Sequence, residues 1–349
     1  MFKTPTQTIY GSTANDIVFP TGPQDTISSV RWSKANNLLA AASWDGRVYL
    51  YDVSQPANIR GLTTLDNPNN SPFFDCDFNK QTTLLAATGA PTHLSILDLT
   101  TSQSHTFQQN THTKPIHNVR FLSPSQSNSP VVATGSWDAT LRYWDLRQPQ
   151  PAAVIPVGER IYTMDCTDKH LVLTTANNKI HIFDLTGDVT KSVETRDTPW
   201  RRTTTCVCVG EVDVSVAGNA KGKGLQDVRT NGDFTFKCHR TVKTSTKPIT
   251  RSTSVYTVNA AAFQGSERPV MATAGSDGKF NFWNVVGTRR LKEFFAPGGG
   301  AITSCTFSAD GDSFVYAVGE DWSKGYGGQS ETQAKLLMHL GVNGDTQMV

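Results

Sequence analysis

A segment that recurs about every 46 residues constrains this chain more than any other feature. Its clearest copies are LAAASWDGRVYLYDV (39–53), VVATGSWDATLRYWDLR (131–147) and VMATAGSDGKFNFWNV (270–285). Weaker copies lie at 84–99, 171–185 and 214–228. Each copy contains a strand of small residues, a polar turn, and an alternating strand that ends in Asp or Asn. A period of this length is typical of repeat architectures in which each unit buries its core against the next one.

The repeats predict an all-β fold, a seven-bladed WD-repeat β-propeller, with four antiparallel strands in each repeat. Another alternating strand precedes most copies, and a seventh repeat begins at Ala301. The segment DIVF (16–19) is expected to complete the last blade and close the ring, which removes exposed sheet edges. We interpret residues 1–349 as one domain with a flexible tail after about residue 341. Four insertions read as loops between blades: 54–70, 101–112, 186–199 and 229–253.

Composition narrows the class of protein further. The 349 residues carry a formal net charge of +2 and only 18% are charged, which excludes a disordered polyelectrolyte. No run of 18 apolar residues occurs, and the first 20 residues do not look like a secretory signal. Six irregularly spaced cysteines suit a reducing compartment. Residues 200–292 hold 15 Lys and Arg against 6 Asp and Glu, so one part of the chain is locally basic.

The sequence does not indicate an enzyme. It contains no phosphate-binding G-x-x-x-x-G-K-[ST] loop, no G-x-S-x-G nucleophile elbow and no H-E-x-x-H zinc motif. Cys206 and Cys208 form a C-x-C on an expected strand, without a second Cys or His pair at zinc-site spacing. We therefore expect buried thiols, no catalytic residues, no metal and no cofactor.

The turns of the clearest repeats carry two kinds of candidate residue. Asp45, Asp138 and Asp277 are expected to be structural, because a short carboxylate can accept backbone N–H groups across a turn. Trp44 and Trp137 precede two of these aspartates, where a small side chain would suffice. They either pack over the neighbouring blade or anchor a partner on one face of the disc.

Two segments combine aromatic and basic residues. FTFKCHR (234–240) contains Phe236, and FNFWNVVGTRRLK (280–292) contains Trp283 followed by Arg289, Arg290 and Lys292. Such residues can stack on bases and neutralise phosphates. The alternative is that the aromatic side chains belong to the core of a blade and that the cations lie in a solvated loop.

FTFKCHR, SWDATLRYWDLR (136–147) and EDWSKG (320–325) carry a family resemblance. The chain resembles the WD-repeat mRNA export factor family (the Rae/Gle class), which is related to Bub-type spindle-checkpoint propellers. The resemblance covers residues 16 to about 325. It implies an adaptor that docks an acidic segment of a nuclear pore protein, the Gle-binding sequence, and that weakly binds single-stranded RNA. It also implies a location in the nucleus, at the nuclear pore and rim, with a cytoplasmic pool, and a role at the mitotic spindle.

The resemblance assigns roles to particular residues. Trp44, Trp137, Lys237 and Arg240 are expected to contact the nucleoporin peptide, and Lys223 stands where the family has another cation. The residues expected to bind RNA match an aromatic pocket beside a basic loop: Phe236, Trp283, Arg289, Arg290 and Lys292. Thr205 and Asn284 depart from the family pattern, where Arg and Asp are usual.

Three functions remain open from the sequence. The first is a non-enzymatic, pore-associated adaptor in mRNA export. The second is a Bub-type checkpoint scaffold that binds similar motifs on kinetochore proteins. The third is a propeller adaptor for an unrelated complex.

Overall fold

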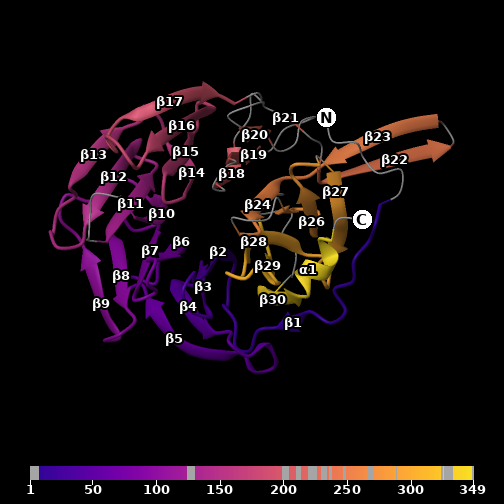
Figure 1. Cartoon of the computed structure of the whole chain (residues 1–349), viewed down its shortest axis with the longest axis horizontal. Coiled ribbons are helices and arrows are strands. Elements are labelled where there is room, and N and C mark those ends of the chain that lie inside the picture. Colours follow the sequence, from indigo (N-terminus) through magenta and orange to yellow (C-terminus); the bar gives the residue numbers. More distant parts are fainter. Residues whose placement is uncertain are drawn as a thin grey trace.

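The structure, a computed structural model, describes residues 8–347 except 124–129, 199–203, 210–213, 219–225, 229–233, 236–237, 247–248, 266–269, 288, 324 and 326–332. The described strands form seven four-stranded antiparallel sheets around a common axis, together with one two-stranded hairpin (Figure 1). The all-β WD-repeat propeller predicted from the sequence is therefore confirmed as an architecture. In the described part of the chain, no helix is long and apolar enough to cross a membrane.

We number the sheets as blades 1 to 7 in chain order and give their strands from the axis outward. Blade 1 contains β2 (Ile27–Trp32), β3 (Leu38–Ser43), β4 (Arg47–Asp52) and β5 (Arg60–Asp66). Blade 2 contains β6 (Phe73–Phe78), β7 (Leu84–Gly89), β8 (Leu94–Asp98) and β9 (Gln103–Phe107). Blade 3 contains β10 (Ile116–Leu122), β11 (Val131–Ser136), β12 (Thr140–Asp145) and β13 (Ala153–Pro156).

Blade 4 contains β14 (Ile161–Cys166), β15 (His170–Thr175), β16 (Lys179–Asp184) and β17 (Ser192–Asp197). Blade 5 contains β18 (Thr204–Val209), β19 (Val214–Gly218), β20 (Gln226–Val228) and β21 (Phe234–Thr235). Blade 6 contains β24 (Val258–Phe263), β25 (Val270–Gly275), β26 (Lys279–Asn284) and β27 (Arg289–Phe295). Blade 7 contains β28 (Ala301–Phe307), β29 (Ser313–Gly319), β30 (Lys335–Leu340) and β1 (Ile17–Val18).

The second strand of each repeat is small and apolar because neighbouring blades cover both of its faces. In β3, for example, Ala40, Ala41 and Ala42 are completely buried. Seven hydrophobic clusters result among the described residues, and each spans two consecutive blades around the ring. The core is thus divided among the interfaces between blades, and no blade is stable without its neighbours.

The two ends of the chain meet in blade 7. β1 pairs antiparallel with β30, with Ile17 opposite Met338 and Val18 opposite Leu337. Just before β1, Asp16 binds Nδ1 of His339 at 2.6 Å and accepts a hydrogen bond from the Tyr316 hydroxyl at 2.5 Å. The edge of this sheet is therefore occupied by a strand from the opposite end of the sequence (Figure 1).

The C-terminal segment after residue 341 corrects the expectation of a flexible tail. Val342–Asp345 form a short helix, α1, and Val342 is completely buried. Asp345 binds Nε2 of His339 at 2.8 Å and pairs with Lys292 of blade 6 at 2.6 Å. These contacts pack residues 342–345 against blades 6 and 7.

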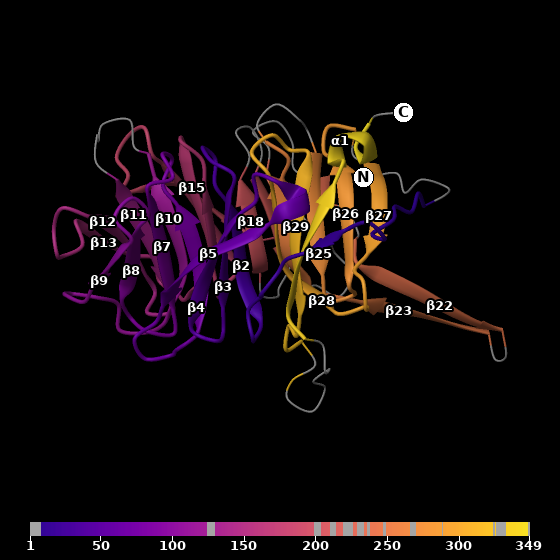
Figure 2. The same cartoon turned by 90° about the horizontal axis from the view of Figure 1, so that it is seen from below.

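Segments interpreted as loops also contain regular structure. All four insertions include the outermost strand of a blade: β5, β9, β17 and β21. The fourth also contains most of a hairpin of β22 (Arg240–Thr246) and β23 (Ile249–Val255), which projects from the disc between blades 5 and 6 (Figures 1 and 2). The sequence misses these strands because they are polar; in β5 only Leu65 is buried.

Side chains of the innermost strands connect each blade to the next. Ser304 accepts the Val30 N–H at 3.0 Å, Asp75 accepts the Val119 N–H at 3.2 Å, and Thr163 accepts the Val207 N–H at 3.2 Å. Two more carboxylates do the same: Asp77 to the N–H of Phe121 and Asp165 to the N–H of Val209. Because each bond joins separate sheets, these side chains fix how neighbouring blades are oriented.

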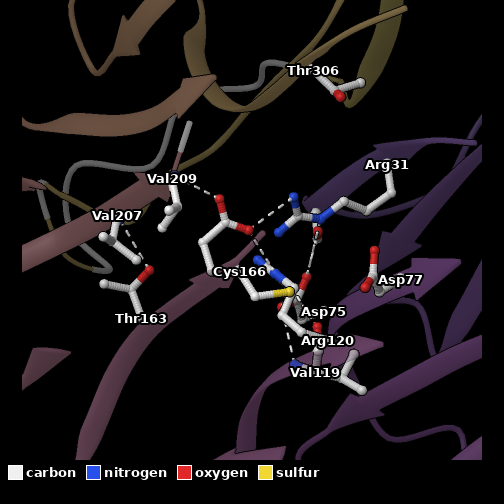
Figure 3. Close-up of polar contacts among 12 residues, drawn as sticks. Arg31, Asp75, Asp77, Val119, Arg120, Thr163, Cys166, Val207, Val209 and Thr306 are labelled. Carbon is white, nitrogen blue, oxygen red and sulfur yellow. Dashed lines mark hydrogen bonds and ion pairs between the residues drawn. The ribbon is translucent and has the colours of Figure 1, made fainter. Parts of the chain in front are cut away.

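A buried ion-pair cluster ties four of the inner strands together (Figure 3). Arg120 of blade 3 binds Asp75 of blade 2 and, through Nε, Asp165 of blade 4 at 2.9 Å. Arg31 of blade 1 lies within 4.0 Å of the same two carboxylates. Two cations and two anions therefore balance, and this local neutrality makes the burial of Arg120 and Asp75 tolerable.

Burial shifts the ionisation of the carboxyl groups near this cluster. It raises the pKa of Asp75 to about 6 against the attraction of Arg31. It raises the pKa of Asp77, which also lies near Arg31, to about 7. The pKa of Asp165 is raised for the same reason. These acids serve as acceptors for backbone N–H groups, so we assign them a structural role.

The first prediction concerns Arg120, whose side chain is only 6% exposed. Substituting Arg120→Met keeps much of the side-chain length but leaves Asp75 and Asp165 with only the more distant Arg31. The free energy of unfolding should fall by about 3 kcal/mol or more, because breaking a buried pair leaves uncompensated charge. Denaturant titration at neutral pH measures this loss. The triple variant Arg120→Met, Asp75→Asn, Asp165→Asn should regain part of the stability; a single variant as stable as wild type would contradict the assigned role.

The second prediction concerns pH. Burial disfavours the charged form of His339, but hydrogen bonds to Asp16 and Asp345 outweigh it and raise its pKa to about 9. In the unfolded chain the pKa of a histidine is about 6.5. The stabilisation is therefore complete below about pH 6.5 and is lost as the pH rises through about 9. The free energy of unfolding should decrease by about 3 kcal/mol over that pH range. In His339→Gln this decrease should be much smaller, and equal slopes in both proteins would refute the assignment.

Candidate functional site

Aromatic side chains from neighbouring blades lie next to one another on the face that carries the turns between the second and third strands. Trp322, which follows β29, stacks on Trp44 with a centroid distance of 6.0 Å. Phe74 of β6 lies 6.1 Å from Trp44 and 6.1 Å from Trp137. His117 of β10 stacks on Trp137 at 5.8 Å. We call these five residues the aromatic strip; it crosses blades 7, 1, 2 and 3.

Every member of the aromatic strip is half-buried. The indole nitrogens of Trp137 and Trp322 are buried and have no hydrogen-bond partner among the described residues. Trp44 and Trp137 both contact Phe74 of the blade between them, so the packing alternative considered from the sequence holds in part. Both also keep an exposed surface. The strip can therefore offer apolar area to a partner without rearrangement of the turns.

The turn aspartates hold the turns that present the two tryptophans. Asp45 accepts hydrogen bonds from the N–H groups of Gln24 at 2.8 Å and of Arg47 at 3.1 Å. Asp138 accepts the N–H of Thr140 at 2.9 Å, and Asp277 accepts that of Lys279 at 3.3 Å. Each carboxylate thus crosses its turn and fixes the backbone there.

A chain of side-chain hydrogen bonds extends inward from two of these turns. In blade 3 His112 binds Asp138 and Thr134, and Thr134 Oγ1 accepts Trp144 Nε1 at 2.8 Å. In blade 6 His239 binds Asp277 at 2.7 Å and Thr273 at 3.1 Å, and Thr273 Oγ1 accepts Trp283 Nε1 at 2.9 Å. Each chain locks a turn to the third strand of its blade.

In the hydrogen-bond chain of blade 3, only Asp138 carries a charge at neutral pH. Burial lowers the pKa of His112 in spite of the nearby Asp138. Burial alone would raise the pKa of Asp138, but hydrogen bonds from His112 and Thr140 bring it well below its usual range. A carboxylate only accepts hydrogen bonds, so Nδ1 of the neutral His112 must carry the proton.

The structure corrects the role expected for Trp283. This side chain is only 4% exposed and belongs to the blade 6 hydrogen-bond chain, so it cannot stack on a base. It occupies a core position, as the alternative interpretation of this segment held. Phe236 lies outside the described residues.

The cations expected to bind RNA lie on a strand and not in a loop. Arg289, Arg290 and Lys292 belong to β27, the outer strand of blade 6. Arg290 pairs with Glu293 at 2.6 Å and donates a hydrogen bond to Thr8 at 2.7 Å. Lys292 pairs with Asp345. Arg290 and Lys292 therefore have acidic partners within the chain.

Of the three cations expected at the peptide, the structure describes one. Arg240 is the first residue of β22. It directly follows His239, which binds the turn residue Asp277 in blade 6. Its Nε and Nη2 atoms are buried and have no hydrogen-bond partner among the described residues. Lys223 and Lys237 lie outside the described residues. Arg240 is therefore a guanidinium with unused donors beside one of the turns of this face.

Sequence reasoning missed three members of the strip: Phe74, His117 and Trp322. Trp322 lies in the EDWSKG string that carried the family resemblance, but no contact could be assigned to it. Phe74 and His117 both occupy the second position of an innermost strand. The sequence does not reveal their role, because alternation alone does not show which side chains reach the face.

Comparison with known proteins identifies the repeat and its relatives. The WD domain, G-beta repeat family matches residues 15–52 and 101–145. WD40 repeat protein poxJ of Penicillium oxalicum is 34% identical, over 90% of each chain. The poly(A)+ RNA export protein of Schizosaccharomyces pombe is 32% identical, over 94% of this chain and 91% of its own. The mRNA export factor GLE2 of Chaetomium thermophilum is 33% identical, over 98% and 94%.

More distant similarities concern the checkpoint branch and the fold. The spindle assembly checkpoint protein bub3 of Schizosaccharomyces pombe is 28% identical over 84% of this chain and 88% of its own. Among solved structures, the WD40 repeats of RRP9 superpose with a TM-score of 0.76 over 96% of this chain and 99% of that one. Their sequence identity of 13% shows a common fold and nothing more.

Proposed function

Because this chain belongs to the family of WD-repeat mRNA export factors, we propose that it is a binding adaptor in mRNA export that docks an acidic segment of a nucleoporin on the aromatic strip. The docked segment would be of the Gle-binding-sequence type that the resemblance implies. The corresponding location is the nucleus and the nuclear pore, with a cytoplasmic pool.

The aromatic strip is the observation that carries this proposal. Large aromatic side chains dominate binding hot spots because they bury much area at little conformational cost. Four rings in succession lie about 6 Å apart from Trp322 to Trp137 and remain partly exposed. The turns that present Trp44 and Trp137 are fixed by Asp45 and Asp138, so a partner would meet a preorganised surface.

Arg240 supports the acidic character of the partner. A guanidinium whose Nε and Nη2 are buried without acceptors is unfavourable unless a counter-ion reaches it. A carboxylate can accept two parallel N–H donors from arginine, which adds both energy and geometric specificity. A glutamate or aspartate of the docked segment would provide that acceptor.

A checkpoint scaffold is the second candidate, supported by the 28% identity to bub3. The higher identity and coverage of the two export relatives favour the export role. Localisation decides between them: an export adaptor lies at the nuclear rim in interphase, whereas a checkpoint scaffold gathers at kinetochores in mitosis.

Binding of single-stranded RNA stays a prediction. In the structure Arg290 and Lys292 pair with Glu293 and Asp345, so contact with a phosphate requires that these pairs open or share the cation. This cost agrees with weak binding that has little sequence preference.

The third prediction concerns the two tryptophans. Trp44→Ala and Trp137→Ala should each weaken binding of a synthetic Gle-binding-sequence peptide by about 2 kcal/mol or more, because a central aromatic anchor is removed. Isothermal calorimetry measures the affinity. Phe295→Ala is a matched control, since Phe295 is 49% exposed on the outer strand of blade 6, away from the strip. Unchanged affinity in both tryptophan variants would leave the strip as packing alone.

The fourth prediction concerns RNA. With the peptide bound, a uridine oligonucleotide should bind weakly, and the logarithm of its affinity should fall linearly with the logarithm of salt concentration. The slope is about −0.7 for each contacted phosphate, or about −2 for three. The double variant Arg289→Gln, Arg290→Gln should reduce the steepness by about 1.4. Fluorescence anisotropy measures both quantities. A slope equal to that of the wild type would remove β27 as the RNA-binding strand.

A further inference from the structure

The innermost strand of each blade contains a β-bulge at the same position. The register between the first and second strands skips one residue near the start of the first strand in all seven sheets. A bulge bends the strand and redirects the side chain of the extra residue. From blade 1 to blade 7 the extra residues are Ser28, Phe74, His117, Tyr162, Thr205, Asn259 and Thr303.

In blades 1, 6 and 7 the bulge residue is polar and bonds to the next blade. Ser28 donates to the carbonyl of Phe73 at 2.8 Å. Asn259 donates to the carbonyl of Ile302 at 3.0 Å, and Thr303 donates to that of Ile27 at 2.6 Å. The acceptor is the carbonyl of the first or second residue of the next innermost strand. In these three blades the bulge residue therefore has a structural role, because its side chain joins consecutive blades.

Blades 2, 3 and 4 break this pattern in succession. Their bulge residues are Phe74, His117 and Tyr162, and the described residues show no such bond from any of them. Phe74 has no donor, and Nδ1 of His117 is buried without a hydrogen-bond partner among the described residues. Three adjacent blades thus lack a stabilising bond and carry a half-buried aromatic ring in its place. The rings of Phe74 and His117 pack against Trp137, yet all three rings stay partly exposed. Where a local rule is broken in this way, a functional constraint is a usual reason.

Two of the three rings already belong to the aromatic strip, and the third lies in the next blade. Phe74 and His117 lie 5.7 Å apart and both contact Trp137. Tyr162 occupies the equivalent bulge in the next blade, and the guanidinium of Arg160 lies 5.7 Å from the centre of its ring. Arg160 is half exposed and pairs with Glu159 at the surface. An apolar patch therefore has a cation at its blade 4 end.

We propose that Phe74, His117 and Tyr162 form an apolar subsite that binds an aliphatic or aromatic side chain of the docked acidic segment. This inference rests on the proposed function and specifies which part of the segment is recognised. Phe74 and His117 belong to the strip, and Tyr162 holds the equivalent bulge in the next blade. A carboxylate of the segment next to the bound apolar side chain would meet Arg160. The segment thus needs an apolar residue flanked by acidic ones.

Substitutions that restore the pattern of the other blades test the subsite. Phe74→Ser and Tyr162→Thr introduce the residue types that bond to the next blade at Ser28 and Thr303. Tyr162→Thr should keep the melting temperature of the wild type, whereas Phe74→Ser also removes the ring that packs between Trp44 and Trp137 and should lower it. Each variant should weaken binding of the synthetic Gle-binding-sequence peptide about tenfold. If these residues only packed the fold, the affinity of both folded variants for the peptide would equal that of the wild type.

Thr303→Val is the matched control. It preserves side-chain shape at the bulge of blade 7 but removes the bond to the Ile27 carbonyl. Its melting temperature should fall, and its affinity for the peptide should stay that of the wild type. A second comparison uses a peptide whose apolar residues are replaced by serine. Phe74→Ser should weaken binding of that peptide less than twofold, because the contact is already lost.

The outcomes separate this inference from the proposed function. If the wild type does not bind the peptide, both are wrong. If the wild type binds and Trp137→Ala weakens binding, but Phe74→Ser and Tyr162→Thr do not, the docking face stands and the apolar subsite is refuted. If Phe74→Ser weakens the original and the serine-substituted peptide equally, Phe74 does not contact an apolar residue, and the inference is again refuted.

Discussion

Hydrogen bonds between the innermost strands of consecutive blades are the constraint on which the rest of this structure depends. A four-stranded blade cannot bury its two faces alone, so its stability requires neighbours in a defined orientation. Side chains such as Asp75, Thr163 and Ser304 provide that orientation by accepting backbone N–H groups of the next blade. The buried pairing of Arg120 with Asp75 and Asp165 extends the same link over three blades. These bonds set the spacing of the turns, and hence of the tryptophans on the face.

Much of the fold was predictable because each repeat combines a buried small-residue strand with a turn aspartate. The outer strands were not, because solvent covers their outer side and a strand such as β5 has only one buried residue. The C-terminal segment was misjudged for a different reason. Its order depends on Asp345, which contacts both His339 and Lys292, and no local pattern reveals partners that lie 6 and 53 residues away.

The candidate site could be predicted only in part, because it too depends on contacts between residues that are distant in the sequence. Trp44 and Trp137 stood out because large aromatic residues are unnecessary in a turn. Trp283 looked similar beside its cations, yet its indole donates to Thr273 inside blade 6. Phe74 and His117 looked like ordinary strand residues, and their position on the face follows from a bulge in each first strand. A bulge shifts the alternation of side chains by one residue, and the sequence does not mark where it occurs.

Charge counted along the chain is also a poor guide to charge on the surface. Residues 200–292 have nine more basic than acidic residues. On β27, however, basic side chains form ion pairs with acidic residues of the same strand or of other parts of the molecule. Lys292 pairs with Asp345 of α1, and Arg290 pairs with Glu293. Arg240 is different, since two of its buried nitrogens have no partner in the described part of the chain. Among the described cations expected to bind a partner, Arg240 is therefore well suited to an acidic segment, and a docked carboxylate there would replace a solvation shell that burial of these two nitrogens has already removed.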